Sequence, residues 1–248
     1  MLLNAWLLAV GTLTAIPTAP PRAVDRRIAG LAMVLAPLAV LPLGLAVGAV
    51  ALTGLPALIK GLLAVGILTI GTRAFHLDGL ADTVDGLAAS HDRERSLAVM
   101  KTGDVGPAGA VALILVIGVQ AVGFASVLHG WRGGVVAVLA VCGSRVALAT
   151  CCARGIPSAR PGGLGDTYTQ SVPVIVTTLM WGLLAGGLAL AGHGFGLPWW
   201  RGPVAVAVAG ATVGLLIVHV RRRLGGVTGD VFGAAIELAL AALLVVLA

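Results

Sequence analysis

Long uninterrupted apolar segments constrain the fold of this chain more than any other feature of its sequence. Each is 18 to 26 residues long with few charges, and together they cover residues 28–53, 57–74, 107–128, 134–153, 172–191, 203–220 and 231–248. About 20 consecutive apolar residues form a helix that spans a bilayer, whereas the strands of a membrane barrel alternate apolar and polar residues. The sequence therefore predicts an all-α, polytopic helical integral membrane protein with about seven transmembrane helices.

Shorter patterns complete this prediction. Residues 4–16 are apolar but too few to span a membrane with ease, so we expect a short re-entrant or interfacial N-terminal helix. Residues 1–17 lack the basic start of a signal peptide, so we expect this helix to be retained. Pro37 and Pro42 should kink the first span. We expect residues 1–248 to form a single membrane-embedded catalytic domain.

Basic residues are distributed unevenly over the predicted connections. Residues 17–27, 75–106, 154–171 and 221–230 carry eleven of the 16 Lys and Arg, whereas the opposite connections carry only Arg132 and Arg201. By the positive-inside rule the basic side is cytoplasmic, which predicts a multi-pass protein of the inner (cytoplasmic) membrane with its active face in the cytoplasm. The net charge of +6 is explained by these membrane ends, so we expect membrane lipid around the chain and no nucleic-acid partner.

Phe75 to Gly86 reads F-H-L-D-G-L-A-D-T-V-D-G and predicts a cytoplasmic helix with an acidic face. Asp78, Asp82 and Asp85 stand at i, i+4 and i+7, so they share one side of a helix, and Gly79 and Gly86 beside them should leave a strip open to a ligand. A solvated acidic face is the simpler interpretation, but only 10% of this chain is charged. Three carboxylates so close repel one another unless a cation lies among them, which predicts a magnesium site.

Further candidates lie in other segments. Ser90 to Lys101 is predicted as an amphipathic helix with Leu97 and Met100 toward the membrane. Arg145 and Glu237 are ionisable residues inside predicted spans; they form a structural ion pair, or Arg145 reaches a phosphate. We also keep the site candidates that adjoin the acidic helix or open the last helix, where N-terminal amides favour an anion: His76, Thr228 and Asp230.

Four motifs together resemble the cobalamin synthase family, the adenosylcobinamide-GDP ribazoletransferases. They are H-L-D-G-L-A-D-T-V-D-G at 76–86, D-R-E-R-S-L-A-V-M-K at 92–101, A-R-P-G-G-L-G at 159–165 and G-G-V-T-G-D-V-F-G-A-A at 225–235. The resemblance implies a membrane transferase of the late cobalamin pathway. Its substrates would be adenosylcobinamide-GDP and α-ribazole or its phosphate. The enzyme would join them with release of GMP and would require Mg²⁺. A homo-oligomer is compatible with this prediction.

Attack of a ribose hydroxyl on a pyrophosphate needs metal ions and cationic side chains around the phosphates. We assign the metal to Asp78, Asp82 and Asp85, and catalysis to these three with Lys101 and Asp104. Substrate contacts are assigned to His76, Arg93, Arg145, Arg154, Arg160, Thr228, Asp230 and Glu237, with Lys101 also touching phosphate. Asp230 and Glu237, seven residues apart, could also hold a second metal or orient the arginines.

One position departs from the family pattern. The family usually has a carboxylate directly after the lysine of the M-K motif, where this chain has Thr102, and Asp104 stands two positions further on. Two roles are open for Asp104. Its loop bends back so that Asp104 joins the three aspartates as a ligand or base, or Asp104 caps the helix that starts at Pro107. We favour the first role.

Two alternatives share part of this evidence. CDP-alcohol phosphotransferases begin their motif D-x-x-D-G-x-x-A-R; Asp82, Asp85, Gly86 and Ala89 match it, but Ser90 replaces the arginine and the second half is absent. This match supports shared metal chemistry. An ion or proton transporter would need carboxylates near the bilayer midplane, whereas these three stand at a membrane edge and the chain shows no internal repeat.

Overall fold

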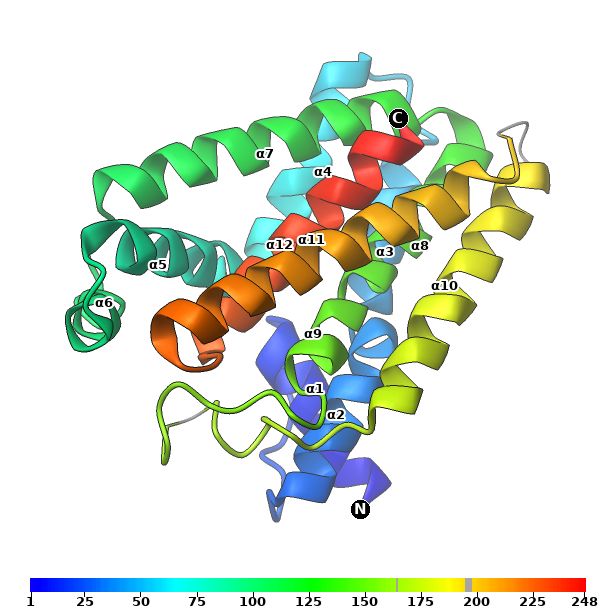
Figure 1. Ribbon diagram of the computed structural model, residues 1–248. Helices are drawn as coiled ribbons and strands as arrows, with labels where there is room; N and C mark the ends of the chain where they lie inside the picture. Colours follow the sequence, from blue (N-terminus) through cyan, green and yellow to red (C-terminus); the bar gives the residue numbers. More distant parts are fainter. Residues whose placement is uncertain (164, 195–197) are drawn as a thin grey trace.

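The structure is a computed structural model that describes residues 1–163, 165–194 and 198–248. In this part of the chain all regular elements are helices, which confirms the all-α prediction (Figure 1). They are α1 (Leu2–Leu13), α2 (Arg26–Ala39), α3 (Leu41–Val50), α4 (Ala57–Gly71), α5 (Phe75–Ala89), α6 (Arg93–Val99), α7 (Pro107–Val127), α8 (Gly130–Ser144), α9 (Val146–Cys151), α10 (Val174–Gly194), α11 (Arg201–Leu224) and α12 (Gly229–Leu247).

Among the described residues, six segments are long and apolar enough to cross a membrane: α2 with α3, α7, α8 with α9, α10, α11 and α12. A seventh is present if α4 and α5, which meet at a bend of 90°, form one broken span. Arg73 and Ala74 make this bend with left-handed φ values of 56° and 57°. The protein is thus a multi-pass helical membrane protein with about the predicted number of spans.

Two spans are interrupted. The first breaks at Val40, and Pro42 occupies the first turn of α3, which confirms the predicted kink. The second breaks at Arg145, between α8 and α9. No proline stands at this second break. Gly143 and Ser144 directly precede it, and the Ser144 hydroxyl donates to the Val141 carbonyl at 2.8 Å, a signal that the sequence prediction did not use.

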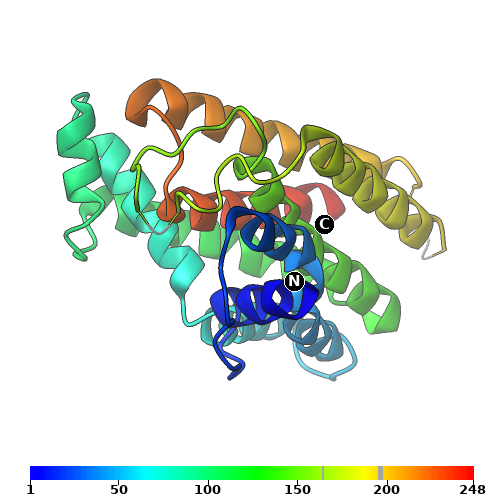
Figure 2. The ribbon, with the colours of Figure 1, turned by 90° about the horizontal axis from the view of Figure 1, so that it is seen from below.

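Helix α12 forms the centre of the molecule. It packs along α5 and α11 and also contacts α7, α8 and α9, as Figures 1 and 2 show from two directions. Small residues allow the close approach of α5: a Cβ on Gly233 would lie 2.8 Å from the His76 carbonyl oxygen, and one on Gly79 would lie 2.6 Å from that of Asp230. Close packing through glycine is typical of membrane helices. The acidic helix is therefore held within the bundle rather than lying free beyond it.

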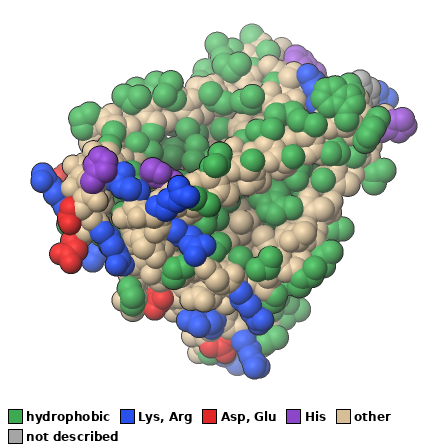
Figure 3. Space-filling view, in the orientation of Figure 1, with side chains coloured by type: hydrophobic (Ala, Val, Ile, Leu, Met, Phe, Trp, Pro, Cys, Tyr) green, Lys and Arg blue, Asp and Glu red, His purple; other side chains and the backbone are tan. Residues whose placement is uncertain are grey.

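The predicted basic connections meet at one end of the bundle. Arg93 donates to the Ala159 carbonyl and Arg160 to the Leu97 carbonyl, at 3.0 and 2.7 Å, and Arg223 donates to the Ser90 carbonyl. Figure 3 shows charged side chains gathered at the lower left, whereas apolar side chains cover most of the remaining surface in that view. Three of the four connections predicted to share a membrane side thus contact one another directly.

The prediction for α6 needs a correction. Asp92 caps this helix, accepting a hydrogen bond from the Arg95 amide at 2.8 Å. Met100 is 3% exposed and Leu97 packs against the core, so these side chains face the protein rather than the membrane. Arg160 and Arg223 draw α6 and the residues before it against the bundle, which turns the apolar side inward.

Candidate active site

A groove of about 520 Å³ opens at the N-terminal end of α12. Its walls combine the start of α5, the segment that follows α6, the loop after α9 and the first turn of α12. Its polar side chains are Lys101, Ser158, Arg160, Thr228 and Asp230. Segments far apart in the sequence therefore build one polar depression at the charged end of the bundle.

Thr228 fixes the start of α12. Its backbone is extended, with φ −118° and ψ 174°, and its side-chain oxygen accepts the Val231 N–H at 3.3 Å. The Thr228 hydroxyl also donates to Asp230 Oδ2 at 3.1 Å. The first turn of the helix is thereby aimed into the groove, where its free N–H groups favour a negatively charged ligand.

Arg160 and Asp230 form the ion pair of the groove. Arg160 Nη1 lies 3.6 Å from Asp230 Oδ2, and both side chains are about a quarter exposed. The other terminal nitrogen of Arg160 is bonded to the Leu97 carbonyl, so the guanidinium is held in place by α6. A fixed cation beside a helix N-terminus is suited to binding a phosphate.

The three aspartates of α5 differ in exposure although they share one side of the helix. Asp78 is exposed, Asp82 is half-buried and Asp85 is 8% exposed. The contact between the Gly79 and Asp230 backbones brings Asp78 next to the groove. The accessible part of the predicted acidic face is therefore its N-terminal half.

The pKa of the Asp82 carboxyl is raised by its surroundings. Burial and then the charges of Asp78, Asp230 and Asp85 raise the pKa of Asp82 to about 6, against a smaller opposing effect of Arg160. Asp82 lies on α5, outside the six described segments that are by themselves long and apolar enough to span a membrane. Four carboxylates from α5 and α12 thus share one region with an excess of negative charge.

Asp85 has a structural task. Its Oδ2 accepts the Gly106 N–H at 2.7 Å, and its Oδ1 accepts the Gly109 N–H at 2.8 Å. These amides belong to the N-terminal end of α7, which Asp85 caps from a different helix. The cap alternative for Asp104 is therefore wrong, because Asp85 takes that position; Asp104 itself is exposed.

The carboxylates of α5 are ligands of the type that a hard cation takes, but their side chains do not converge on one point. Among the described residues, no three His, Cys, Asp or Glu side chains are grouped closely enough to hold a metal ion. The side chains of Asp78 and Asp82, however, are not engaged in a hydrogen bond or ion pair within the described chain, and the pKa of Asp82 is raised first by burial and then by the neighbouring carboxylates. Such oxygens are the ligands that Mg²⁺ takes together with phosphates.

The other predicted substrate residues fall into two sets. Lys101, Arg160, Thr228 and Asp230 line the groove, whereas Arg93 and Arg154 do not. Arg93 is bonded to the Ala159 carbonyl, and the exposed Arg154 uses its backbone amide to bond the Val172 carbonyl.

His76, Arg145 and Glu237 lie deeper, in a buried polar cluster that we define as His76, Gln120, Ser144, Arg145 and Glu237. Gln120 donates to Glu237 Oε2 at 2.7 Å, and Arg145 donates to the Val141 carbonyl at 2.9 Å and to Ser144 Oγ at 2.7 Å. The Nδ1 atom of His76 is 3.9 Å from Glu237 Oε1. Arg145 is 1% exposed and does not reach the groove, so neither its expected ion pair nor its expected phosphate contact is formed in this conformation.

The glycine strip predicted beside the carboxylates is not open to a ligand. Gly79 touches the backbone of Asp230, and a Cβ on Gly86 would overlap Met100. Both glycines instead let α12 and α6 approach α5. Likewise, Asp230 and Glu237 do not converge on one site: Asp230 faces Arg160, and Glu237 faces Gln120.

Sequence reasoning missed two residues that organise this region. Gln120 is a lone amide in the apolar segment 107–128, and its intramembrane position is a signal that it has a polar partner. Arg223, in the run of three arginines that ends α11, donates to the carbonyls of Leu87 and Ser90. No pattern in the run distinguishes this arginine from its two neighbours.

Comparison with known proteins gives one consistent result. A family model described as cobalamin-5-phosphate synthase matches residues 5–248. A protein of a Nocardioides species named adenosylcobinamide-GDP ribazoletransferase is 50% identical over 245 residues, covering 97% of this chain and 96% of its own length.

Two relatives with the same name are more distant. The protein of Frankia casuarinae is 35% identical over 254 residues, covering 95% of this chain and 91% of its own. That of Pseudomonas aeruginosa strain PAO1 is 35% identical over 250 residues, covering 99% and 98%. No solved structure matches the chain significantly.

Proposed function

Because the chain belongs to the cobalamin-5-phosphate synthase family, and is thus a transferase of cobalamin synthesis, we propose that it joins adenosylcobinamide-GDP to α-ribazole or its phosphate and releases GMP. A ribose hydroxyl oxygen bonds to the phosphorus on the cobinamide side. The phosphoanhydride bond breaks, and GMP leaves with its electron pair. The hydroxyl proton passes to a carboxylate.

The groove at the start of α12 is the observation that carries this proposal. It combines a helix N-terminus, the fixed guanidinium of Arg160 and the ammonium of Lys101 with four nearby carboxylates. A pyrophosphate needs the cationic groups, because charge on its oxygens grows as the leaving phosphate departs. A hydroxyl nucleophile needs an acceptor for its proton.

Magnesium is proposed as the cofactor, held by Asp78, Asp82 and Asp85 as the sequence predicts, with Asp230 adjoining them. When bound, the ion would neutralise phosphate oxygens and the mutual repulsion of the carboxylates. Asp85 would have to bind it through oxygen lone pairs not used by the α7 amides. One of the α5 aspartates, or Asp104 if its loop closes, takes the proton.

The experiment is a GMP-release assay with purified protein, adenosylcobinamide-GDP and α-ribazole, with and without Mg²⁺. GMP should appear in equal amount to the joined product and only with both substrates and the metal. Release of GMP without α-ribazole would indicate a hydrolase, and release of CMP from a CDP-alcohol would instead indicate the phosphotransferase chemistry.

The groove is proposed to face the cytoplasm. In a background without the three native cysteines, cysteines at the exposed positions of Arg95 and Arg222 should resist an impermeant thiol reagent in intact cells. A cysteine at the exposed Arg132, at the opposite end, should react. Labelling at Arg95 without labelling at Arg132 would reverse this orientation.

A further inference from the structure

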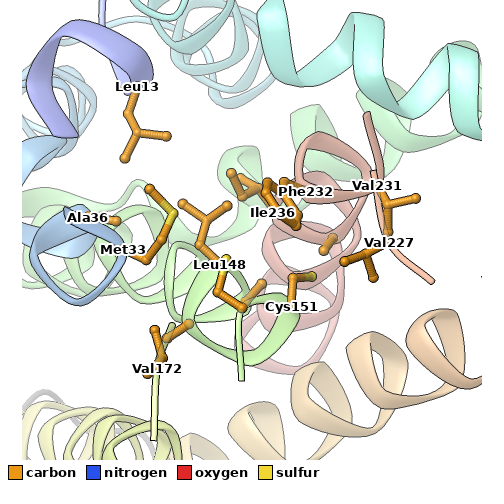
Figure 4. Close-up of a cluster of buried hydrophobic side chains, with 14 of the residues drawn as sticks. Leu13, Met33, Ala36, Leu148, Cys151, Val172, Val227, Val231, Phe232 and Ile236 are labelled. Atoms are coloured by element: carbon orange, nitrogen blue, oxygen red, sulfur yellow. The ribbon is translucent and has the colours of Figure 1, made fainter. Parts of the chain in front are cut away.

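A second cavity, of about 220 Å³, lies directly behind the groove, between α1, α2, α5, α9 and α12. The two cavities share the wall residues Phe75, Gly165 and Gly229. Leu13, Met33, Leu148 and Phe232 converge on this second cavity from four helices, and Figure 4 shows these side chains. We call it the apolar cavity.

Its size and chemistry suit one flat ring system. An apolar cavity of about 150 Å³ is enough to bind benzene, whereas pockets for whole drug-sized ligands begin at about 300 Å³. Tyr168 and Phe232 stand edge to face in the wall, with ring centroids 6.5 Å apart. Aromatic walls of this kind favour an aromatic ligand.

The polar residues in the wall restrict which aromatic ligand the apolar cavity can bind. Tyr168 has the Thr12 side chain as a polar neighbour for its hydroxyl. His76 is 2% exposed, and neither of its ring nitrogens has a hydrogen-bond partner among the described residues. Its Nδ1 is the nitrogen near Glu237, but 3.9 Å is too long for a hydrogen bond. A buried imidazole without partners is costly unless a ligand supplies one.

We propose that the apolar cavity binds the bicyclic aromatic base of the ribazole substrate, with His76 hydrogen-bonded to the free ring nitrogen of that base. The shared wall then leads the attached ribose into the groove, toward the pyrophosphate. This assignment rests on the proposed function, which supplies the ribazole, and adds to it the place where the acceptor is selected.

Guanine of the other substrate is the main competitor, and its chemistry fits less well. Its edges carry acceptors at O6 and N7 and a donor at N2, all of which would need partners. The cavity offers one unpaired side chain, His76, among the described residues. The base of ribazole has a single free nitrogen and an otherwise apolar edge, which matches one polar group in an apolar wall.

The test is a set of Michaelis constants, KM, for three variants. Thr12→Phe fills the cavity from its half-buried rim, and His76→Phe keeps a ring but removes the nitrogens. Thr178→Phe, at an exposed position of α10 away from both cavities, is the matched control. Thr12→Phe and His76→Phe should raise the KM for α-ribazole at least about tenfold, and all three variants should keep the KM for adenosylcobinamide-GDP within about twofold.

A smaller acceptor substrate distinguishes a loss of cavity volume in Thr12→Phe from misfolding of the variant. Thr12→Phe should discriminate less against the riboside of imidazole, which lacks the fused ring, than against α-ribazole, whereas misfolding would penalise both equally. An increased KM for adenosylcobinamide-GDP alone would place guanine in the cavity and overturn the proposal. Unchanged constants for both substrates, with activity that follows the acyl chains of added lipid, would assign the cavity to lipid.

Binding of α-ribazole, measured without turnover, tests the cavity assignment separately from the proposed reaction. α-Ribazole alone should raise the melting temperature, Tm, of the wild-type protein and of Thr178→Phe, but not that of Thr12→Phe. If the wild type shows this shift yet releases no GMP, the proposed function fails and the cavity assignment stands. If GMP is released but α-ribazole binds Thr12→Phe as tightly as wild type, the cavity assignment fails alone. Should Thr12→Phe not fold, the same Tm measurement with His76→Phe decides the question, because α-ribazole should raise the Tm of this variant less than that of the wild type.

Discussion

Two groups of polar side chains, one at Asp230 and one at Glu237, lie seven residues, or about 10 Å, apart along α12. They differ in exposure to water and in hydrogen bonding. The groove at Asp230 is open, and the side chains of the neighbouring Asp78 and Asp82 make no hydrogen bond within the described chain. The buried polar cluster at Glu237 is closed to water, and Gln120 and Ser144 occupy its charged groups.

The difference separates reaction from stability. Unpaired carboxylates repel one another and weaken the fold, which is the physical reason for proposing a cation beside the groove that compensates them. In the buried polar cluster a bond satisfies Glu237 where no water can, so its loss should affect folding. Mutations at Asp82 and at Gln120 should therefore change different measurements.

Asp85 combines a structural role with a proposed catalytic one, and Asp85→Asn should have the largest total effect. An amide can replace one of the two carboxylate oxygens that accept the α7 amides, so about 1 kcal/mol of stability should be lost. Loss of a metal ligand should also lower turnover at least about 100-fold. Tm and GMP release are measured together; normal turnover with a lowered Tm would make Asp85 purely structural.

Asp82→Asn should lower turnover at least about 100-fold without lowering Tm. The side chain forms no bond within the described chain, and its removal relieves repulsion from Asp78, Asp230 and Asp85. Glu94→Gln, an exposed acidic position on α6, is the control and should retain turnover. Near-normal turnover of Asp82→Asn at low Mg²⁺ would contradict its assignment as a ligand.

Gln120→Leu should act on stability, because it leaves the Glu237 carboxylate without its partner in the membrane interior. The expected cost is about 1–3 kcal/mol. The double variant Gln120→Leu/Glu237→Leu removes both polar groups and should recover most of the loss. Thermal unfolding in detergent measures all variants; additive losses in the double variant would show that the pair is not coupled.

Asp104→Asn should have the smallest effect. Asp104 is exposed and does not line the groove, and Asp85 rather than Asp104 caps α7. We expect unchanged Tm and a rate loss below about tenfold. A loss of 100-fold at saturating Mg²⁺ would instead make Asp104 the base and require its loop to close over the groove.

Local sequence patterns determined much of this protein. Continuous apolar segments predicted the helices and nearly every span, because a chain in lipid must satisfy its backbone within each helix. The spacing of Asp78, Asp82 and Asp85 placed three carboxylates on one helix side, and Thr228 marked the start of the last helix. Four quoted motifs were sufficient for the family.

Only the tertiary structure decided what each polar group contacts. The sequence predicts that Gly79 and Gly86 lie beside the carboxylates but not that α12 and α6 fill that space. It placed Arg145 inside a span but gave no sign that Ser144, its neighbour, would bond it. The apolar cavity joins five helices, from α1 to α12. Periodicity fixes the direction of a side chain on its own helix, whereas partners depend on how helices distant in sequence pack together.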